Sequence, residues 1–439
     1  YKEYSNTEGA WLFLGNTPLE DVRFPPGFYA WRITKDGYDT IEGARLVNRA
    51  LTHAEYQLSK KGSIPSGMVL VPATDSPVGL IGFPAHKRAA LEAFLIDRFE
   101  VTNQKYKKFV DDGGYTKREY WEHDFVKDGR KLTWEEGIGE FRDMTGWSGP
   151  RLWRYGSYPK GQDDCPMGGI SWYEAAAYAK YIGKDLPTIY HWGRAAMATL
   201  TGPSVVPKSN YELEGPISVG GGQAMGFYGT YDMAGNVREW CYNSADDSGY
   251  TRYILGGAWG EADYTFSMPA TCSPFDRSFK IGLRCMKYLD EEKIAEERRE
   301  FLTGPRHLVQ RDLRKAKPIS DDEFELIRTS LFSYDRNIPF DAEVQTYDDI
   351  WDSYRKVKVT INTAYNRERM AIYIFTPKNK NVSPPYQAVI DFPPGSAFES
   401  RSSEGMMPNG AVIKSGRAEI VPIYRGTYER DPLPQGLST

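Results

Sequence analysis

Histidine and cysteine, two side chains that often bind transition metals, are scarce in this chain of 439 residues. It has five histidines and four cysteines, and the histidines lie far apart without the spacing of metal ligands. Cys165, Cys241, Cys272 and Cys285 contain no Cys-x-x-Cys pair, which argues against a structural zinc site. We interpret them as buried thiols and leave a disulfide open. We interpret His191, within an apolar helical stretch, as a core or surface residue rather than a metal ligand.

The chain also lacks an excess of charge of one sign and any long apolar run. Its net charge is −4, with 55 basic and 59 acidic residues interspersed, so there is no electrostatic case for nucleic acid or a membrane surface. No stretch reaches the ~18 apolar residues of a membrane helix, and the first residues have no signal-peptide pattern. The opening residues 1–4 (YKEY) resemble the interior of a protein, and we interpret the chain as a fragment.

Aromatic residues, in contrast, are abundant. They make up 14% of the chain, with 30 tyrosines and 11 tryptophans, which favours a fold with little regular structure held by ring packing. The length predicts two to four domains, since a domain has ~100–200 residues. The pattern of short helices and short strands places the chain in the α+β class.

One stretch, residues 231–240 (YDMAGNVREW), concentrates the chemistry. Asp232 and Glu239 stand on either side of a Gly235-Asn236 turn. Carboxylate oxygens, with backbone carbonyls that such a turn can aim inward, are suitable ligands for Ca²⁺. The alternative, which spacing alone does not exclude, is a polar surface loop without a metal.

A series of short motifs in a fixed order resembles the formylglycine-generating enzyme (sulfatase-modifying factor) family. The motifs are residues 67–72 (GMVLVP), 94–97 (FLID), 99–103 (FEVTN), 113–115 (GGY), 170–175 (ISWYEA), 186–188 (LPT), 231–240, 256–257 (GG) and 282–284 (GLR). They span about half of the chain. The resemblance implies a loop-rich, C-type-lectin-like fold over residues 67–288, with calcium ligands Asp232 and Glu239 and the carbonyls of Gly235 and Val237.

Active members of that family bind copper(I) through two cysteines and use O₂ to oxidise a substrate cysteine. Aligning the motif at residues 256–257 puts Glu261 and Phe266 at the positions of those cysteines. It also puts Ala258 in place of a serine and Arg238 in place of a tryptophan of the active site. Copper(I) prefers soft thiolate ligands, so we expect no copper and a catalytically degenerate site.

Further departures concern the family's disulfides and a related iron enzyme. Cys272 and Cys285 match disulfide positions of some members, but the partner positions fall on Ala179 and on residues 196–197, so no disulfide carries over. The related non-haem iron sulfoxide synthases bind iron through histidines of a separate helical domain, which this chain lacks.

The flanks predict other domains. Residues 1–45 alternate like strands at 10–14 and 28–33 and resemble the small β-domain named for its Pro-Glu-Gly-Ala motif, of which residues 8–10 remain; residues 46–66 form a linker. Residues 289–332 form a helical linker, with a charged helix from 289 to about 314 and a second helix at 321–331.

Residues 333–439 resemble the start of an α/β-hydrolase, with strands at 357–361, 369–375, 387–392 and 418–423. Residues 392–395 (FPPG) would provide one N–H of the oxyanion hole, but no Gly-x-Ser-x-Gly follows, and no histidine occurs after His307. A hydrolase triad is therefore incomplete in this chain.

We thus predict a multidomain, bacterial-type protein whose degenerate central domain binds an unknown protein or small ligand near Trp147, Trp153 and Trp259. The arrangement resembles the tails of large Ser/Thr kinases, whose kinase domain would lie upstream. The compartment stays open, with a soluble, extracytoplasmic part of a membrane protein as one interpretation. Two alternatives remain: an active sulfatase-modifying or related metal-dependent oxidase, and part of an esterase or peptidase whose nucleophile lies outside this chain.

Overall fold

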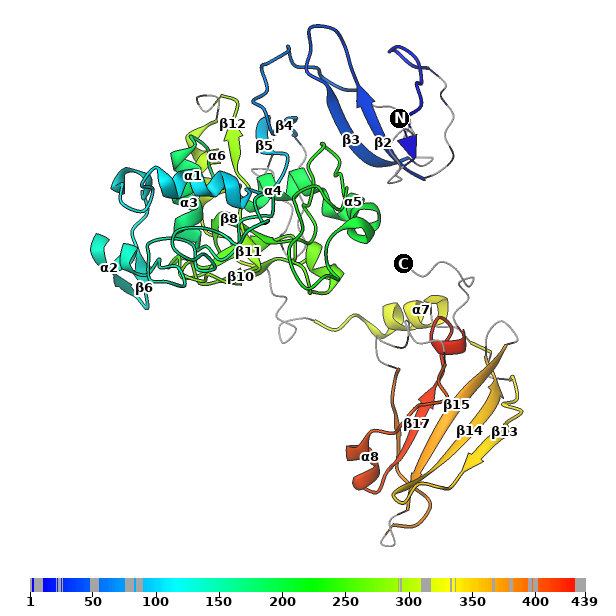
Figure 1. Ribbon diagram of the computed structural model, residues 1–439. Helices are drawn as coiled ribbons and strands as arrows, with labels where there is room; N and C mark the ends of the chain where they lie inside the picture. The colour runs from blue at the N-terminus through cyan, green and yellow to red at the C-terminus, as the bar shows by residue number, and fades with distance from the viewer. Residues whose placement is uncertain are drawn as a thin grey trace. The chain divides into compact units, whose positions relative to one another are not determined.

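In a computed structural model of the protein, the chain forms two compact units, residues 1–311 and 312–439 (Figure 1). The structure describes residues 2–3, 11–20, 22, 25, 27–47, 55–75, 83, 90–290, 292, 294–308, 317–331, 334–335, 337–364, 368–378, 382–393, 397 and 402–430. None of the helices within these residues has the length and apolar character that a membrane span requires.

The first unit contains short strands in three main sheets. The first sheet has the order β1-β2-β3, the second β12-β5-β4 and the third β10-β9-β8-β11, in which β11 is parallel to β8. The strands are β1 (Lys2–Glu3), β2 (Gly27–Ile33), β3 (Ile41–Val47), β4 (Met68–Val71), β5 (Phe94–Asp97), β8 (Arg238–Ser244), β9 (Arg252–Leu255), β10 (Ala270–Cys272), β11 (Ile281–Gly282) and β12 (Met286–Tyr288). A two-stranded ribbon, β6 (Val126–Lys127) with β7 (Arg130–Lys131), lies between β5 and β8 in the sequence.

The helices of this unit begin at side-chain caps. Thr102 caps α1, and Thr188 caps α4. At α3, Ser171 and Glu174 form a capping box, because each side chain bonds the other residue's backbone N–H. The helices are α1 (Asn103–Asp111), α2 (Trp134–Gly139), α3 (Trp172–Tyr181), α4 (Ile189–Ala196), α5 (Ala198–Val205) and α6 (Glu296–Thr303).

Two aromatic clusters form the core of this unit. One contains Trp192 with Tyr253, and the other contains Tyr106, Trp172 and Trp240; all five rings are almost fully buried. In the second cluster, Tyr106 stacks on Tyr178 with ring centroids 5.0 Å apart. The expectation of a loop-rich, mixed α+β fold held by ring packing is therefore confirmed for this unit.

The hairpin of β2 and β3 packs against the loop that leads into residues 231–240. The N–H of Ala44 donates to the carbonyl of Gly226 at 3.0 Å, and Glu42 accepts from Arg98 at 3.1 Å. The predicted strand at 10–14 is wrong for its described part, since residues 11–14 belong to no strand. The Glu-Gly-Ala motif at 8–10 lies outside the described residues.

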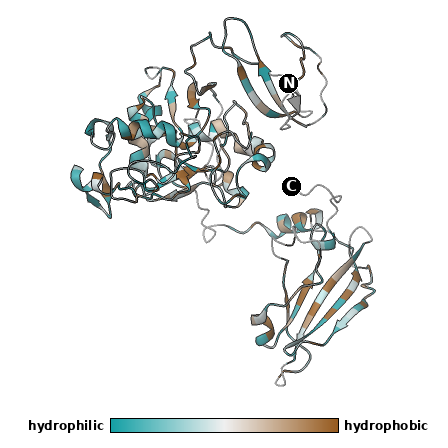
Figure 2. Cartoon of the chain, viewed as in Figure 1, coloured by the Kyte–Doolittle hydropathy of each residue, from teal (hydrophilic) through white to brown (hydrophobic). Residues whose placement is uncertain are grey.

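The second unit is a five-stranded sheet of order β13-β14-β15-β17-β16, antiparallel except for the parallel pair β16 and β17. Apolar and polar residues alternate along its strands (Figure 2). The elements are α7 (Asp321–Leu331), β13 (Glu343–Asp348), β14 (Tyr354–Asn362), β15 (Arg369–Pro377), β16 (Ala388–Ile390), α8 (Gly410–Lys414) and β17 (Ala418–Pro422). The four predicted strands are confirmed, and β13 was not foreseen.

The predicted charged helix from 289 to about 314 is shorter than expected. Among the described residues of this range, which end at 308, α6 covers Glu296–Thr303. Gly304 and Pro305 follow, and Pro305 cannot continue a helix because it lacks a backbone N–H. Of the predicted oxyanion loop at 392–395, only Phe392 and Pro393 lie within the described residues.

Candidate functional site

The stretch from 231 to 240 is held in a tight turn by left-handed backbone conformations. Asp232, Gly235 and Asn236 have φ values of 55°, 71° and 59°. A Cβ at Gly235 would lie 2.7 Å from the carbonyl oxygen of Asn210, so only glycine fits there. The turn bonds to the motif at 256–257, since Gly235 donates to the carbonyl of Gly256 at 2.9 Å.

A buried ion pair lies behind this turn. The guanidinium of Arg284 donates to both carboxylate oxygens of Glu239 at 2.7–3.0 Å, and Trp192 Nε1 donates to Glu239 Oε2 at 2.8 Å. Arg284 also donates to the carbonyls of Asp97 and Tyr231 at 3.0 and 2.8 Å. Arg284 and Glu239 are essentially inaccessible to solvent. The pair therefore connects the motifs at residues 94–97, 231–240 and 282–284, which are far apart in the sequence.

Glu100 is a second buried acid of the site, although no motif predicts a role for it. Its carboxylate accepts from Asn236 Nδ2 at 2.7 Å and from the N–H of Val237 at 3.1 Å. Burial, with the nearby carboxylates of Asp232 and Glu239, holds the pKa of Glu100 well above its ordinary value. In the sequence, the one indication of a buried acid is that Glu100 stands between the apolar residues Phe99 and Val101.

Asp232 is nearly as buried, and its carboxylate accepts the N–H of Gly220. Burial raises the pKa of Asp232 to about 6. Three buried carboxylates thus face one guanidinium, that of Arg284. Burial of several carboxylates beside a single cation opposes their ionisation, which is why the pKa values of Glu100 and Asp232 are raised.

Of the four residues predicted as calcium ligands, Glu239 already bonds protein donors. Both of its carboxylate oxygens accept hydrogen bonds from Arg284, and Oε2 also accepts one from Trp192. The described residues hold no group of three or more His, Cys, Asp or Glu side chains that could bind a metal. The surplus of buried carboxylates is the one feature that favours a cation, and calcium binding stays a prediction.

Three of the four degenerate active-site positions come together. Arg238 donates to both oxygens of Glu261, with Nη2–Oε2 at 2.7 Å and Nε–Oε1 at 3.2 Å. The N–H of Ala258 donates to Glu261 Oε2 at 3.1 Å. The fourth position, Phe266, is buried apart from this group against Trp192. An ion pair and a core phenyl ring therefore occupy the positions at which the family resemblance predicts a degenerate thiol pair.

All four cysteines are free thiols. Burial raises the pKa of each of them, that of Cys272 to about 12. They are therefore protonated at neutral pH, whereas copper(I) requires thiolates.

The three tryptophans predicted to line a binding surface differ in exposure. Trp147 is 58% exposed, and Trp259 is partly exposed, stacked on Phe279 at a centroid distance of 5.3 Å. Trp153 is only 1% exposed, so its assignment to a binding surface was wrong. Its ring packs edge-on against Tyr106, in the core.

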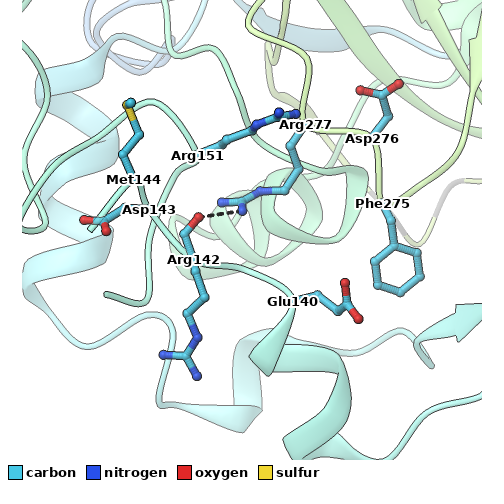
Figure 3. Close-up of a pocket in the computed structure, with 8 residues that line it drawn as sticks. All are labelled: Glu140, Arg142, Asp143, Met144, Arg151, Phe275, Asp276 and Arg277. Atoms are coloured by element: carbon cyan, nitrogen blue, oxygen red, sulfur yellow. Dashed lines mark hydrogen bonds between the residues drawn. The ribbon is translucent and has the colours of Figure 1, made fainter. Parts of the chain in front are cut away.

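A hollow of about 640 Å³ lies beside the segment of the chain that contains Trp147. Figure 3 draws the residues that line it, which are Glu140, Arg142, Asp143, Met144, Arg151, Phe275, Asp276 and Arg277. Arg277 forms one wall, where it donates to the carbonyls of Arg142 at 2.8 Å and Gly149 at 2.5 Å and pairs with buried Glu174 at 2.9 Å. No local sequence pattern indicates this hollow, because its lining comes from two distant segments.

A family model matches the central part of the chain. The sulfatase-modifying factor enzyme 1-like domain matches residues 49–216 and 208–289, more than half of the chain.

Individual relatives include both inactive and active enzymes. The chain is 27% identical to the inactive C-alpha-formylglycine-generating enzyme 2 of Mus musculus over 51% of this chain and 83% of that protein. It is 27% identical to the formylglycine-generating enzyme of Bos taurus over 45% of this chain and 65% of that one. It is 26% identical to the serine/threonine-protein kinase pkn1 of Chlamydia pneumoniae over 59% of this chain, which spans 44% of the kinase. Similarity alone therefore does not decide between an active and an inactive domain.

Proposed function

The chain belongs to the sulfatase-modifying factor family, and from this premise we propose that its central domain is a catalytically inactive member that binds a protein ligand. The observation that carries the proposal is the ion pair of Arg238 with Glu261 at 2.7 Å. It occupies a position that aligns with one of the copper-binding cysteines of the active enzymes. A carboxylate already bonded to a guanidinium and to a backbone N–H offers no soft ligand to copper(I).

The second aligned position supports the same proposal. Phe266 is 4% exposed and belongs to the aromatic core around Trp192. A phenyl ring there stabilises the fold by burial of apolar surface and supplies no electron-donating ligand. The site has thus exchanged metal ligands for groups that stabilise the folded chain.

Oxygen consumption tests the inactivity. We expect the protein, with stoichiometric copper(I) and a cysteine-containing peptide, to consume no O₂ above the copper-only blank and to leave the peptide thiol intact by mass spectrometry. Peptide oxidation in step with O₂ uptake would overturn the proposal.

A gain-of-ligand variant tests the alignment. The double variant Glu261→Cys/Phe266→Cys should compete for copper(I) against a chromophoric chelator, while the parent and Glu261→Cys alone should not. Circular dichroism of each variant checks that it folds. Equal copper(I) affinity of the parent and the double variant would show that the aligned positions are misassigned.

We also propose that the domain belongs to a multidomain bacterial protein linked to a Ser/Thr kinase. The similarity to the chlamydial kinase supports this, because it covers more of this chain than the family domain alone. The full sequence of the gene product tests it: a kinase domain in the same chain is expected, and its absence would leave the kinase link without support.

A further inference from the structure

The segment from 142 to 157 is fixed from within by one carboxylate. Asp143 accepts the N–H groups of Thr145, Trp147 and Gly156 at 2.7, 3.0 and 2.9 Å, and the hydroxyl of Thr145 at 2.7 Å. Although burial opposes ionisation, these donors hold the pKa of Asp143 below its ordinary value. The segment therefore has a defined conformation before it meets a ligand.

The same segment holds large apolar side chains out in solvent. Met144, Trp147 and Tyr155 are 59%, 58% and 70% exposed. The rings of Trp147 and Tyr155 meet edge to face, with centroids 6.1 Å apart. Tyr155 has a φ of 52°, a conformation that costs energy for a non-glycine residue. Exposed aromatic side chains on a fixed backbone lose little entropy on binding, which is the property of a recognition surface.

The hollow beside this segment has one cation without a partner. Within the part of the chain that the structure describes, no side chain or carbonyl bonds the exposed guanidinium of Arg151. The acids of the lining are engaged: Asp143 by backbone donors, Glu140 by Lys127 at 2.8 Å, and Asp276 by a backbone N–H. Arg142, the other exposed arginine of the lining, bonds the carbonyl of Gly139 and Ser148 Oγ, so Arg151 is the arginine whose guanidinium donors are all open to a carboxylate.

We propose that residues 142–157 and the adjoining hollow bind an extended acidic peptide segment of a partner protein. One carboxylate of the peptide pairs with Arg151, and a neighbouring apolar side chain packs against Trp147 and Tyr155. An arginine fork matches a carboxylate through two parallel N–H···O bonds, and an aromatic pair provides apolar contact area. This inference rests on the proposed binding function and names its ligand class and location.

The test uses the full chain and two fluorescein-labelled peptide pools. In the acidic pool, nine-residue peptides alternate Asp or Glu with Leu, Phe or Tyr; in the amide pool each acid is replaced by Asn or Gln. Fluorescence anisotropy at low salt should show at least tenfold tighter binding of the acidic pool, and added salt should weaken it. Equal affinity of both pools, or binding of neither, would overturn the inference.

Variants locate the binding. Arg151→Gln and Trp147→Ala should each weaken binding of the acidic pool about tenfold, a typical loss for one charged or aromatic contact. Matched controls are Arg154→Gln, an exposed arginine of the same segment outside the lining, and Tyr264→Ala, which is 63% exposed on another element. Both controls should bind like the parent. Equal losses in the Arg151 and Arg154 variants would overturn the location.

The outcomes separate this inference from the proposed function. Absence of peptide binding with no O₂ uptake removes the acidic-peptide site and leaves the inactive assignment in place. Peptide oxidation by the parent removes the inactive assignment whatever the anisotropy shows.

Discussion

The two units of the chain differ in what holds them together. The first has short, irregular elements, yet its core contains fully buried Trp172, Trp192 and Trp240 and the inaccessible pair of Arg284 with Glu239. The second has the longest strands of the described residues but a small core around Tyr373 and Phe375, and no residue of α7 is buried. The unit with the longer and more regular strands thus has the smaller buried core. We expect interior substitutions to cost more in the irregular unit.

The largest expected effect is at the buried ion pair. Arg284→Met leaves Glu239 without its partner inside the protein, and we expect it to lower the free energy of unfolding of the first unit by about 3–5 kcal/mol. The matched change in the second unit is Arg369→Met, which breaks exposed pairs with Asp341 and Glu343 and should cost less than about 1 kcal/mol. Hydrogen exchange resolved by mass spectrometry reads both units in one sample. Equal losses would break the contrast between buried and exposed pairs.

At Asp232 we expect a smaller effect, and here the substitution should raise the free energy of unfolding at neutral pH. The pKa of Asp232 is raised from an ordinary 3.8 to about 6 in the folded state. The protonated carboxyl therefore contributes its full stability below about pH 4, where it is protonated in both the folded and the unfolded chain. That contribution is lost as the pH rises through 6, because ionisation is then costly inside the protein. Asp232→Asn should therefore be more stable than the parent at pH 7, by about 1–3 kcal/mol, and equal to it near pH 4.

The measurement is urea unfolding at the two pH values. An Asp232→Asn variant that is less stable at pH 7 would show that the ionised carboxylate has a favourable partner. The raised pKa of Glu100 leaves a residual pH dependence in the variant.

Helix caps give a third, still smaller contrast. Ser171 and Ser320 begin capping boxes of the same kind, with Glu174 and Glu323 as the reciprocal acids. Ser171 is inaccessible and α3 packs in the core, so Ser171→Ala should cost about 1–2 kcal/mol. Ser320→Ala at exposed α7 should cost about 0.5 kcal/mol or less. Thermal unfolding compares the two variants; a larger loss at Ser320 would contradict the ranking.

The smallest expected effect is that of calcium. Because Arg284 and Trp192 already bond the oxygens of Glu239, we expect added Ca²⁺ to raise the unfolding midpoint of the parent at pH 7 only slightly. Asp232→Asn serves as the control. A rise in the midpoint of the parent, but not of the variant, would establish the calcium site that the motif predicts.

Local features of the sequence were predictable, and long-range ones were not. Thr188 and Ser171 identify the starts of helices because a cap needs only the next three residues. The pairing of Glu239 with Arg284 joins residues 45 positions apart and leaves no periodic signal. The burial of Trp153 depends on what the folded chain places over it. Gly304-Pro305 was a readable helix stop, and charge composition alone led to an overlong helix there.

The family motifs predicted individual positions of the site, but not the contacts between them. The sequence placed Arg238, Ala258 and Glu261 in a degenerate centre, and the structure brings them into contact. It gave no indication that Arg238 and Glu261 pair with each other, because that contact requires the turn at 235–236 and the Gly256-Gly257 segment to meet. The hollow with Arg151 depends on the same kind of convergence.

The pairing of β12 with β5 has a consequence for how such a module is inserted into larger proteins. β5 is flanked on one side by β4, the first strand of the structure within the matched residues 49–289, and on the other by β12, the last. Entry and exit are thus separated by a single intervening strand, about 10 Å across the sheet. Because the two ends of the module lie so close together, a larger protein can hold the whole module at one point of its surface.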